Sequence, residues 1–250
     1  MQAGVSFVAL RGMPEVVAGA DLATLIRAAL VETGMALREA DLLVVAQKIV
    51  SKAEARRVRL ADVEPSVEAR DLAAKVRKDP RFVELVLRES REIVRAVPDI
   101  LITRHRCGWV MANAGIDRSN VPGGEDTVLL LPLDCDASAH RLRAALAPEF
   151  PAIIISDSFG RPWREGTVNV ALGVAGYPAL RDLRGGHDRE GRVLQTTQIA
   201  QADAVAAGAG LVMGETTEGR PVVLVRGLDF SGPLTDGQRL IRSREGDLFR

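Results

Sequence analysis

Residues 152–166 read "AIIISDSFGRPWREG", an apolar run followed at once by polar, charged and glycine residues. The apolar start is typical of a buried strand. Asp157 and Ser158 come directly behind it, and Arg161 and Arg164 follow within a few positions. Loops held by rigid strands are common places for binding groups, so we expect functional side chains where this strand ends.

Two other segments repeat the pattern of an apolar run that gives way to polar and small residues. They are "VMANAGIDRSNVPGG" (110–124), which contains Asp117 and Asn120, and "LVMGETTEGRP" (211–221), which contains Glu215. Small residues between the polar ones let a backbone approach a ligand closely.

Acidic and hydroxyl side chains from the three segments would make an oxygen-rich site for Mg²⁺ or Mn²⁺. The candidates are Asp117, Asn120, Asp157, Ser158 and Glu215. Arg161 and Arg164 could hold phosphate or carboxylate oxygens, which planar guanidinium groups match well. Each segment taken alone can also be interpreted as an ordinary turn or helix cap, with its charged side chains in surface ion pairs.

Composition places the chain among intracellular globular proteins. Its 250 residues carry 33 basic and 33 acidic side chains, which argues against a general electrostatic binder of nucleic acid. The length suits a single domain over 1–250, or two closely joined lobes. Two cysteines without a CxxC pair indicate a reducing compartment. We find no signal peptide or membrane-spanning run, and expect a cytoplasmic protein without a membrane partner.

The periodicity predicts strands and helices mixed without strict alternation, hence an α+β fold with mixed sheets and flanking helices. Asp21 and Asp79 are expected helix caps. Strands are expected over 5–10, 41–51, 127–132, 152–155 and 221–227, with two more around a turn at Cys107-Gly108, and helices over 20–30, 66–78, 80–96, 136–147 and 201–213.

Familiar catalytic motifs are absent from the sequence. There is no GxxxxGK[ST] phosphate loop, and "GAGLVMG" (208–214) follows a helical pattern and misses the dinucleotide spacing by one residue. The histidines are scattered without HExxH, and no serine lies in a GxSxG elbow. The two cysteines are expected to be inert, and Trp109 and Trp163 to be packing residues.

Taken jointly, the segments resemble the coenzyme F420-0:L-glutamate ligase family, the γ-glutamyl ligases of the deazaflavin cofactor pathway. The resemblance spans nearly the whole chain in order. It is carried by "RGMPEVVAGADLATLI", "DLLVVAQKIVSKAE", "KDPRFVELVLRESREIVR", "ANAGIDRSNVP", "LLLP", "IISDSFGRPWREG", "VALGVAGYPALRDLRG" and "LVMGE...GRPVVLVRGL".

This resemblance implies a GTP-dependent ligase with a family-specific fold that works as an intertwined homodimer. Such an enzyme phosphorylates the terminal carboxylate of F420-0 to an acyl phosphate, which the amino group of L-glutamate attacks to form an amide. Further γ-linked glutamates can follow. The resemblance also implies Mg²⁺ or Mn²⁺ and the assistance of a monovalent cation such as K⁺.

Residue by residue, the resemblance assigns the metal to Asp117, Asp157, Ser158 and Glu215. The catalytic set is Asp157, Arg161 and Arg164. The GTP contacts it implies are Met13, Pro14, Glu15, Val16, Gln47, Lys48, Lys52, Asn120, Met213, Gly214, Glu215, Thr216, Thr217, Glu218, Gly219 and Arg220.

The chain departs from the family pattern at a few positions. Asn169 stands where many members have an acid, and "GGHDREGR" (185–192) lacks an arginine and a tyrosine common there. No metal position is affected, but the acceptor pocket could differ. Two alternatives therefore stay open: a related nucleotide-dependent amide ligase acting on another carboxylate, and a non-catalytic nucleotide- or metal-binding protein. The number of glutamates added is also open.

Overall fold

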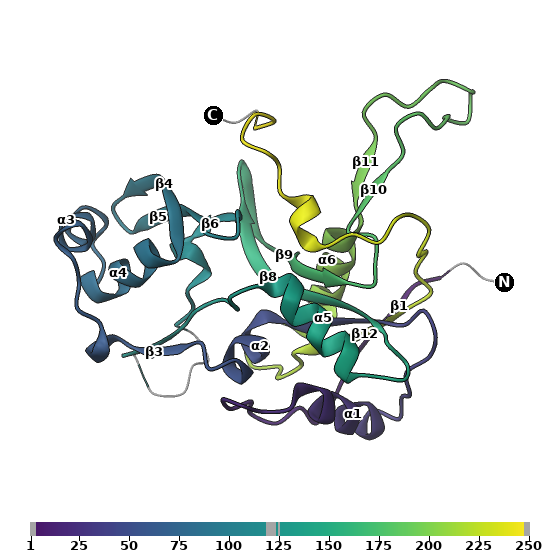
Figure 1. The fold of residues 1–250 in the computed structure, drawn as a ribbon, viewed down its shortest axis with the longest axis horizontal. Helices are drawn as coiled ribbons and strands as arrows, with labels where there is room; N and C mark the ends of the chain where they lie inside the picture. The colour runs from purple at the N-terminus through teal and green to yellow at the C-terminus, as the bar shows by residue number, and fades with distance from the viewer. Residues whose placement is uncertain (1–3, 119–123, 125, 248–250) are drawn as a thin grey trace.

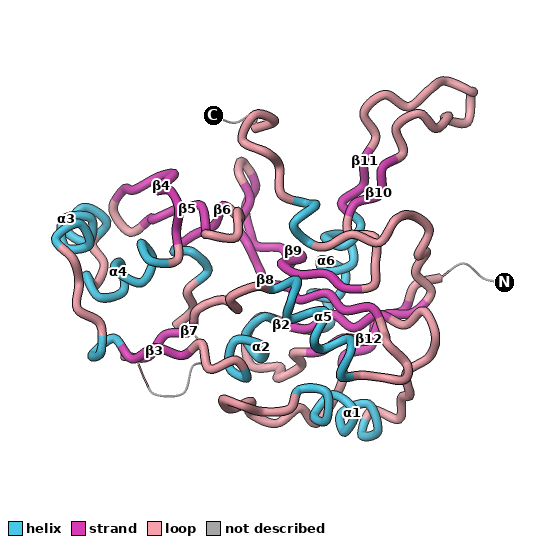
Figure 2. The backbone as a smooth tube through the Cα atoms, in the orientation of Figure 1, coloured by secondary structure: helices cyan, strands magenta, loops and turns pink. Residues whose placement is uncertain are grey.

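A mixed five-stranded sheet forms the centre of the molecule (Figures 1 and 2). This computed structural model describes residues 4–118, 124 and 126–247. The strand order is β1-β12-β2-β8-β9, and only β2 and β8 run parallel. The strands are β1 (Ser6–Ala9), β2 (Leu42–Ala46), β8 (Ala152–Arg161), β9 (Arg164–Ala175) and β12 (Val222–Arg226). The α+β fold with mixed sheets expected from the sequence is confirmed.

Strand β2 is apolar throughout because both faces of the sheet are covered, as in sheets with helices on each side. Leu43 and Val45 point into one cluster of buried residues, and Leu42 and Val44 point into another. Successive side chains of a strand face opposite sides, so an unbroken apolar run fills both cores at once.

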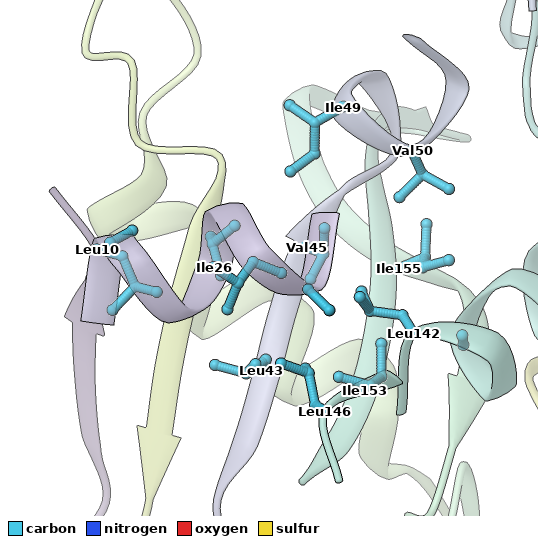
Figure 3. Close-up of a cluster of buried hydrophobic side chains, with 14 of the residues drawn as sticks. Leu10, Ile26, Leu43, Val45, Ile49, Val50, Leu142, Leu146, Ile153 and Ile155 are labelled. Atoms are coloured by element: carbon cyan, nitrogen blue, oxygen red, sulfur yellow. The ribbon is translucent and has the colours of Figure 1, made fainter. Parts of the chain in front are cut away.

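Helices α1 (Leu22–Glu32) and α5 (Cys135–Ala145) cover one face of the sheet. Figure 3 shows Ile26 from α1 and Leu142 from α5 directed toward Leu43 and Ile153 of the sheet. Asp21 caps α1 by accepting hydrogen bonds from the amides of the first turn, so this expected cap is confirmed.

Helix α6 (Gln201–Met213) covers the other face with small and apolar side chains. The helix lies close to the sheet because two of its positions are glycines: a Cβ on Gly210 would be 2.5 Å from Asn169 Oδ1, and one on Gly208 would be 2.6 Å from the ring of Phe7. Small residues at these positions let the backbones of helix and strand approach.

A second group of elements has a core of its own, on the left of Figure 1. It contains a three-stranded antiparallel sheet covered by two helices. The helices are α3 (Val67–Val76) and α4 (Pro80–Arg88), and the strands are β4 (Ser90–Val97), β5 (Ile100–His105) and β6 (Val110–Ala112). Strands β3 (Arg57–Arg59) and β7 (Thr127–Leu129) pair where the chain enters and leaves this lobe, which we call the inserted lobe (residues 57–129).

The polar segment that follows the apolar run at 152–155 is itself strand. Strand β8 continues through Asp157 and Ser158 to Arg161, and pairs with β9 around a turn at Pro162-Trp163. The expectation that the strand ends at 155 is therefore wrong. Its outer half reaches past the helices that bury its inner half, so polar residues can occupy it.

Several other boundaries differ from expectation, and the strand expected over 127–132 ends at Leu129. The run at 41–51 divides into β2 and the short helix α2 (Gln47–Ala53). The helix expected over 80–96 stops at Arg88, and β4 takes the remainder, where Ile93 and Val94 are β-branched. Helix α5 is capped by Asp134, while Asp136 inside it accepts hydrogen bonds from the amides of Val174 and Gly237.

A narrow arm extends away from the body (Figure 1). Its base is the pair β10 (Leu180–Asp182) and β11 (Gln198–Ala200). Short 3₁₀ turns occur at Leu60–Asp62, Asn113–Gly115 and Gly237–Leu240. Among the described residues, no helix combines the length and apolar character that crossing a bilayer requires.

Candidate functional site

One large cavity, of about 1,460 Å³, contains the residues singled out from the sequence. We call it the main cleft. Its lining comes from the β2–α2 junction, the outer half of the β8–β9 hairpin, the loop between α6 and β12, and the inner side of the inserted lobe. Every described residue of the expected set lines it: Met13, Pro14, Glu15, Val16, Gln47, Lys48, Lys52, Asp117, Asp157, Ser158, Arg161, Arg164, Met213, Gly214, Glu215, Thr216, Thr217, Glu218, Gly219 and Arg220. Asn120 lies outside the described residues.

Asp157 is the most perturbed acid of the cleft. Burial raises the pKa of its carboxyl group to about 7, and the negative charges of Asp117 and Glu215 act in the same direction. The amide of Ser158 and the charge of Lys48 oppose the shift without cancelling it. Three segments far apart in the sequence therefore concentrate negative charge at one place.

Lys48 connects the main sheet with the inserted lobe across this place. Its Nζ lies 2.6 Å from Asp117 Oδ2. Lys48 is positioned by α2, which begins immediately where β2 ends. Asp117 is fixed by backbone hydrogen bonds of 2.9 Å in both directions with Leu129.

Lys52 lies one helical turn further along α2 and is buried, with 7% of its side chain exposed. Its Nζ donates a hydrogen bond of 2.7 Å to Glu15 Oε1. Glu15 itself is exposed, so the ion pair brings the segment around Met13–Val16 to the rim of the cleft. Behind it, Ser51 Oγ donates to the buried Gln47 Oε1.

The loop after α6 turns sharply at Gly214 and Gly219, both with left-handed backbone (φ 79° and 63°). Within it Glu218 accepts hydrogen bonds from the amide and the hydroxyl group of Thr216. A Cβ at Gly214 would be 2.3 Å from the carboxyl carbon of Glu218, so the loop is compact. Its exposed acid, Glu215, lines the main cleft.

The tip of the β8–β9 hairpin carries two arginines and an exposed tryptophan. Arg161 donates to the carbonyl oxygen of Glu165, and its buried Nε has no hydrogen-bond partner among the described residues. Trp163 is 81% exposed and has left-handed backbone (φ 57°). The expectation that Trp163 is a packing residue is wrong, because at the hairpin turn its side chain extends into solvent. Trp109 is buried as expected.

Sequence reasoning missed the wall that the inserted lobe contributes. Arg95, Ile102 and Val110 line the cleft from β4, β5 and β6. Nothing in their local sequence marks them, because they face the cleft only through the placement of the lobe. The buried Ser156 Oγ, also unpartnered among the described residues, lines the floor. Only its position directly before Asp157 could have indicated from the sequence that Ser156 belongs to the site.

The cysteines stay apart from this chemistry. Both are free thiols, and burial raises the pKa of each above its ordinary value. A thiol with a raised pKa is a poor nucleophile near neutral pH, which agrees with the inert role expected from the sequence.

The donor chemistry of the cleft suits a hard divalent cation. Carboxylate and hydroxyl oxygens are the ligands that Mg²⁺ and Mn²⁺ prefer. Among them, burial and, to a smaller extent, the negative charges of Asp117 and Glu215 raise the pKa of Asp157. In the part of the chain that the structure describes, no three acidic, histidine or cysteine side chains are already drawn together tightly enough to hold an ion. Lys48 instead holds Asp117.

Comparisons with known proteins agree on one family. The family described as "F420-0:Gamma-glutamyl ligase" matches residues 12–227. The chain is 47% identical over 253 residues to a "Coenzyme F420:L-glutamate ligase" of Methanothermobacter thermautotrophicus, with 99% of each chain covered. Proteins of the same name from Methanopyrus kandleri and Halobacterium salinarum are 46% and 43% identical, with 89% and 97% of this chain covered and 90% and 94% of theirs.

Proposed function

The chain belongs to the F420-0:gamma-glutamyl ligase family, and from this membership we propose that it joins L-glutamate to the terminal carboxylate of F420-0 at the expense of GTP. Members of the family are ligases, so the protein is an enzyme. The observation that carries the detailed proposal is the main cleft, where all described residues of the expected nucleotide, metal and catalytic sets line a single cavity.

The reaction proceeds in two transfers. An oxygen of the acceptor carboxylate attacks the γ-phosphorus of GTP, the bond to the bridging oxygen breaks, and GDP leaves with that electron pair. The amino nitrogen of L-glutamate then attacks the acyl carbon, phosphate leaves, and the nitrogen loses a proton. Each transfer depends mainly on positioning and on compensation of charge.

The residues of the cleft supply both. Lys48 and Lys52 lie one turn apart on α2. They carry the positive charge that binds a triphosphate once their ion pairs with Asp117 and Glu15 break. Arg161 and Arg164 lie at the hairpin tip, where their planar groups can hold carboxylate or phosphoryl oxygens in pairs. The loop from Met213 to Arg220 borders the nucleotide.

A divalent metal ion, Mg²⁺ or Mn²⁺, belongs to the proposal. Asp157, Ser158 and Glu215 would hold it, together with Asp117 when Lys48 turns to phosphate. When bound, it neutralises charge that develops on the phosphoryl oxygens. The proposal also includes assistance by K⁺, a cytoplasmic location and a homodimer.

The function is tested by following GTP consumption with F420-0 and L-glutamate supplied together and singly. We expect GDP release that requires both, and a product heavier than F420-0 by one glutamyl unit or by several, seen by mass spectrometry. Release of GDP with another carboxylate or amine in preference to these two would assign the chain to a related amide ligase. Absence of any nucleotide consumption with all components present would contradict the proposal.

A further inference from the structure

The main cleft has room for more than one ligand. Its volume of about 1,460 Å³ exceeds the range of about 300–1,000 Å³ that is usual for a pocket with a single ligand. The described residues expected to contact GTP lie around Met13–Val16, on α2 and in the loop between α6 and β12. The lining that comes from β5, β6 and the turn at Pro162-Trp163 belongs to none of the nucleotide, metal or catalytic sets, so its role is open.

One face of the three-stranded sheet in the inserted lobe lines the main cleft. In the register of the sheet, Arg95 lies opposite Ile102, and Ile102 lies opposite Ala112. Opposite residues on neighbouring strands share a face, and so do residues two positions apart on one strand, so Val110 lies on this face too. All four line the main cleft. Leu101, which alternates with them along β5, is buried on the other face.

The cleft-facing side of this sheet is apolar where polar residues are usual. An antiparallel sheet that is covered on one side normally alternates apolar residues toward the core with polar residues toward water. Here Ile102, Val110 and Ala112 adjoin one another, and Val110 is 43% exposed. We call these three residues the apolar stripe. Arg95 borders it, and the planar guanidinium group of an arginine stacks on aromatic rings. Contiguous apolar surface inside a cleft is typical of a surface that a ligand covers.

The turn of the β8–β9 hairpin adds a large aromatic side chain to the same cavity. Trp163 lines the main cleft, is 81% exposed and has a φ of 57°. Glycine or asparagine is the usual residue where a turn requires a positive φ directly after a proline such as Pro162. Tryptophan is unfavourable there for the backbone, and its ring loses the free energy of burial. Such strain accumulates at binding sites, where a ligand can cover the ring.

The hairpin and the apolar stripe belong to one region of the cleft. Strands β6 and β8 contact each other, and Figure 1 shows β6 beside the outer half of β8. Phe159, on that outer half, packs against the buried cluster that contains Trp109 and Met111. Met111 lies on β6 between two residues of the apolar stripe. The stripe therefore begins where the hairpin meets the inserted lobe.

We propose that this region binds the planar aromatic ring of the acceptor, with the ring packed on the apolar stripe and in contact with Trp163 and Arg95. This inference rests on the proposed function and extends it to the subsite of the acceptor. F420-0 is a deazaflavin, so it joins such a ring to the carboxylate that is activated. Arg161 and Arg164, proposed above to hold carboxylate or phosphoryl oxygens, lie on the same hairpin as Trp163. The carboxylate can reach them while the ring rests on the inserted lobe.

Isothermal titration calorimetry on the full chain, with saturating GDP and F420-0 as the probe, tests the subsite. The variants are Trp163→Ala, Trp163→Phe and the double variant Ile102→Thr/Val110→Thr, in which threonine keeps the β-branched shape that suits a strand. Ile100→Thr is the matched control. Ile100 lies two positions before Ile102 on the same face of β5 and is 48% exposed, but it does not line the main cleft.

We expect a loss of affinity for F420-0 of about tenfold or more in Trp163→Ala, because the variant lacks both the stacking and the apolar contact of the indole ring. Trp163→Phe, which keeps a ring, should lose less, the double variant several-fold, and the control nothing. Affinity for GTP should stay unchanged in all four.

The proposal is overturned if Trp163→Ala and the double variant, folded by thermal unfolding, bind F420-0 as tightly as the wild type. If that unchanged affinity comes with a shift from dimer to monomer in sedimentation, the region is instead an interface between copies of the chain.

Turnover keeps this test separate from that of the proposed function. If GTP consumption requires F420-0 and L-glutamate, Trp163→Ala is expected to raise the KM for F420-0 and leave the KM for L-glutamate unchanged. If the wild-type chain consumes no GTP with these substrates, the proposed function fails, and calorimetry with F420-0 still decides the subsite. Binding that Trp163→Ala weakens then supports it, and the absence of binding to the wild-type chain overturns it.

Discussion

Lys48 and Lys52 join separate segments of the chain around the main cleft. They lie one turn apart on α2, and each holds a carboxylate from another part of the chain, Asp117 and Glu15. A triphosphate that enters the cleft competes for the same ammonium groups. Nucleotide binding is therefore expected to loosen the contacts that each lysine makes with its neighbouring segment.

Lys52→Ala is expected to weaken GTP binding by about tenfold or more, since a charge-assisted hydrogen bond contributes about 1.5–3 kcal/mol. Stability should change little, because the partner left behind, Glu15, is largely exposed to water. Calorimetric titration with GTP measures the effect, and Lys75→Ala serves as the control. Unchanged affinity in Lys52→Ala would remove this residue from the nucleotide site.

Asp157→Asn is expected to abolish turnover while the fold is retained. The amide has the shape of the carboxyl group but lacks the charge that holds a divalent cation, and relief from the repulsion of Asp117 and Glu215 should leave stability equal or higher. GTP consumption and thermal unfolding are measured together. Activity close to wild type in this variant would contradict the metal role.

Most of the candidate site could be found from the sequence, because each of its acids follows an apolar run. Asp117, Asp157 and Glu215 all line the same cavity, although only Asp157 lies on a strand of the main sheet, while Asp117 follows a 3₁₀ turn and Glu215 follows helix α6. Arg95 and Trp163 could not be found in this way. Arg95 reaches the cleft through the placement of the inserted lobe, and Trp163 is exposed because of the length of the hairpin. The sequence around each residue indicates neither feature.

Among the elements, the β8–β9 hairpin has two environments along its length. Its inner half lies between helices, and a Cβ on Gly173 would be 2.2 Å from the carbonyl oxygen of Cys135 at the start of α5. Its outer half is open, and a Cβ on Gly160 would meet nothing within 4 Å. Both glycines lie in extended backbone, so only their surroundings differ.

Gly173→Ala is expected to destabilise the fold by about 1–3 kcal/mol or more, because backbone of α5 must move to admit a methyl group. Gly160→Ala, the matched control in the same hairpin, should change the free energy of unfolding by less than about 0.5 kcal/mol. Urea unfolding of the two variants provides the comparison. Equal stability of both would show that α5 packs less closely than described.

The boundaries of elements were predicted less well than their existence. The helix expected over 80–96 starts as predicted behind its Asp79 cap and Pro80, but it ends at Arg88 and β4 begins at Ser90. Pairing with β5, a long-range contact, decides the conformation of Ile93 and Val94. In the same way, the helix expected over 136–147 begins at Cys135, and Asp136 inside it accepts hydrogen bonds from the amides of Val174 on β9 and of Gly237, which lie far from it in the sequence.

At the scale of the whole molecule, a buried ion network joins the inserted lobe to the main body. Glu89, at the end of α4, receives hydrogen bonds from both Arg56 and Arg106, and His105 Nε2 lies 3.5 Å from it. Arg56 also donates to the carbonyl oxygen of Leu131. The chain enters the inserted lobe beside Arg56 and leaves it before Leu131, so the network lies at the junction.

This network predicts acid sensitivity. Burial alone would raise the pKa of Glu89, but the imidazole of His105 and the charges of Arg56 and Arg106 outweigh it and lower the pKa to about 2. The depressed pKa contributes stability that is complete above the unfolded value of about 4.3 and is lost as pH falls toward 2. Glu89→Gln should cost on the order of 1–3 kcal/mol at pH 7 and flatten the pH dependence between about 4.5 and 2. Thermal unfolding across this range, with exposed Glu68→Gln as control, checks it.

A homodimer is also expected at this scale. Sedimentation equilibrium should give a mass of roughly twice the 26.9 kDa of one chain. The arm around β10 and β11 extends away from the body, and we expect it to contact the second copy. Deletion of residues 184–196 should then shift the protein toward monomer. A monomeric wild-type chain would contradict this expectation.

The parallel pairing of β2 with β8 bears on the order of events during folding. Ala46 meets Ser156 in this pair, roughly 110 positions later in the chain, and contacts of such high separation form slowly. The inserted lobe is made of closer neighbours and can acquire structure first, while synthesis is still under way. A ribosome-bound chain from which β8 has not yet emerged therefore has Lys48 and Lys52 but lacks the wall of the main cleft that β8 forms. Affinity for GTP should then appear only at a late stage of translation.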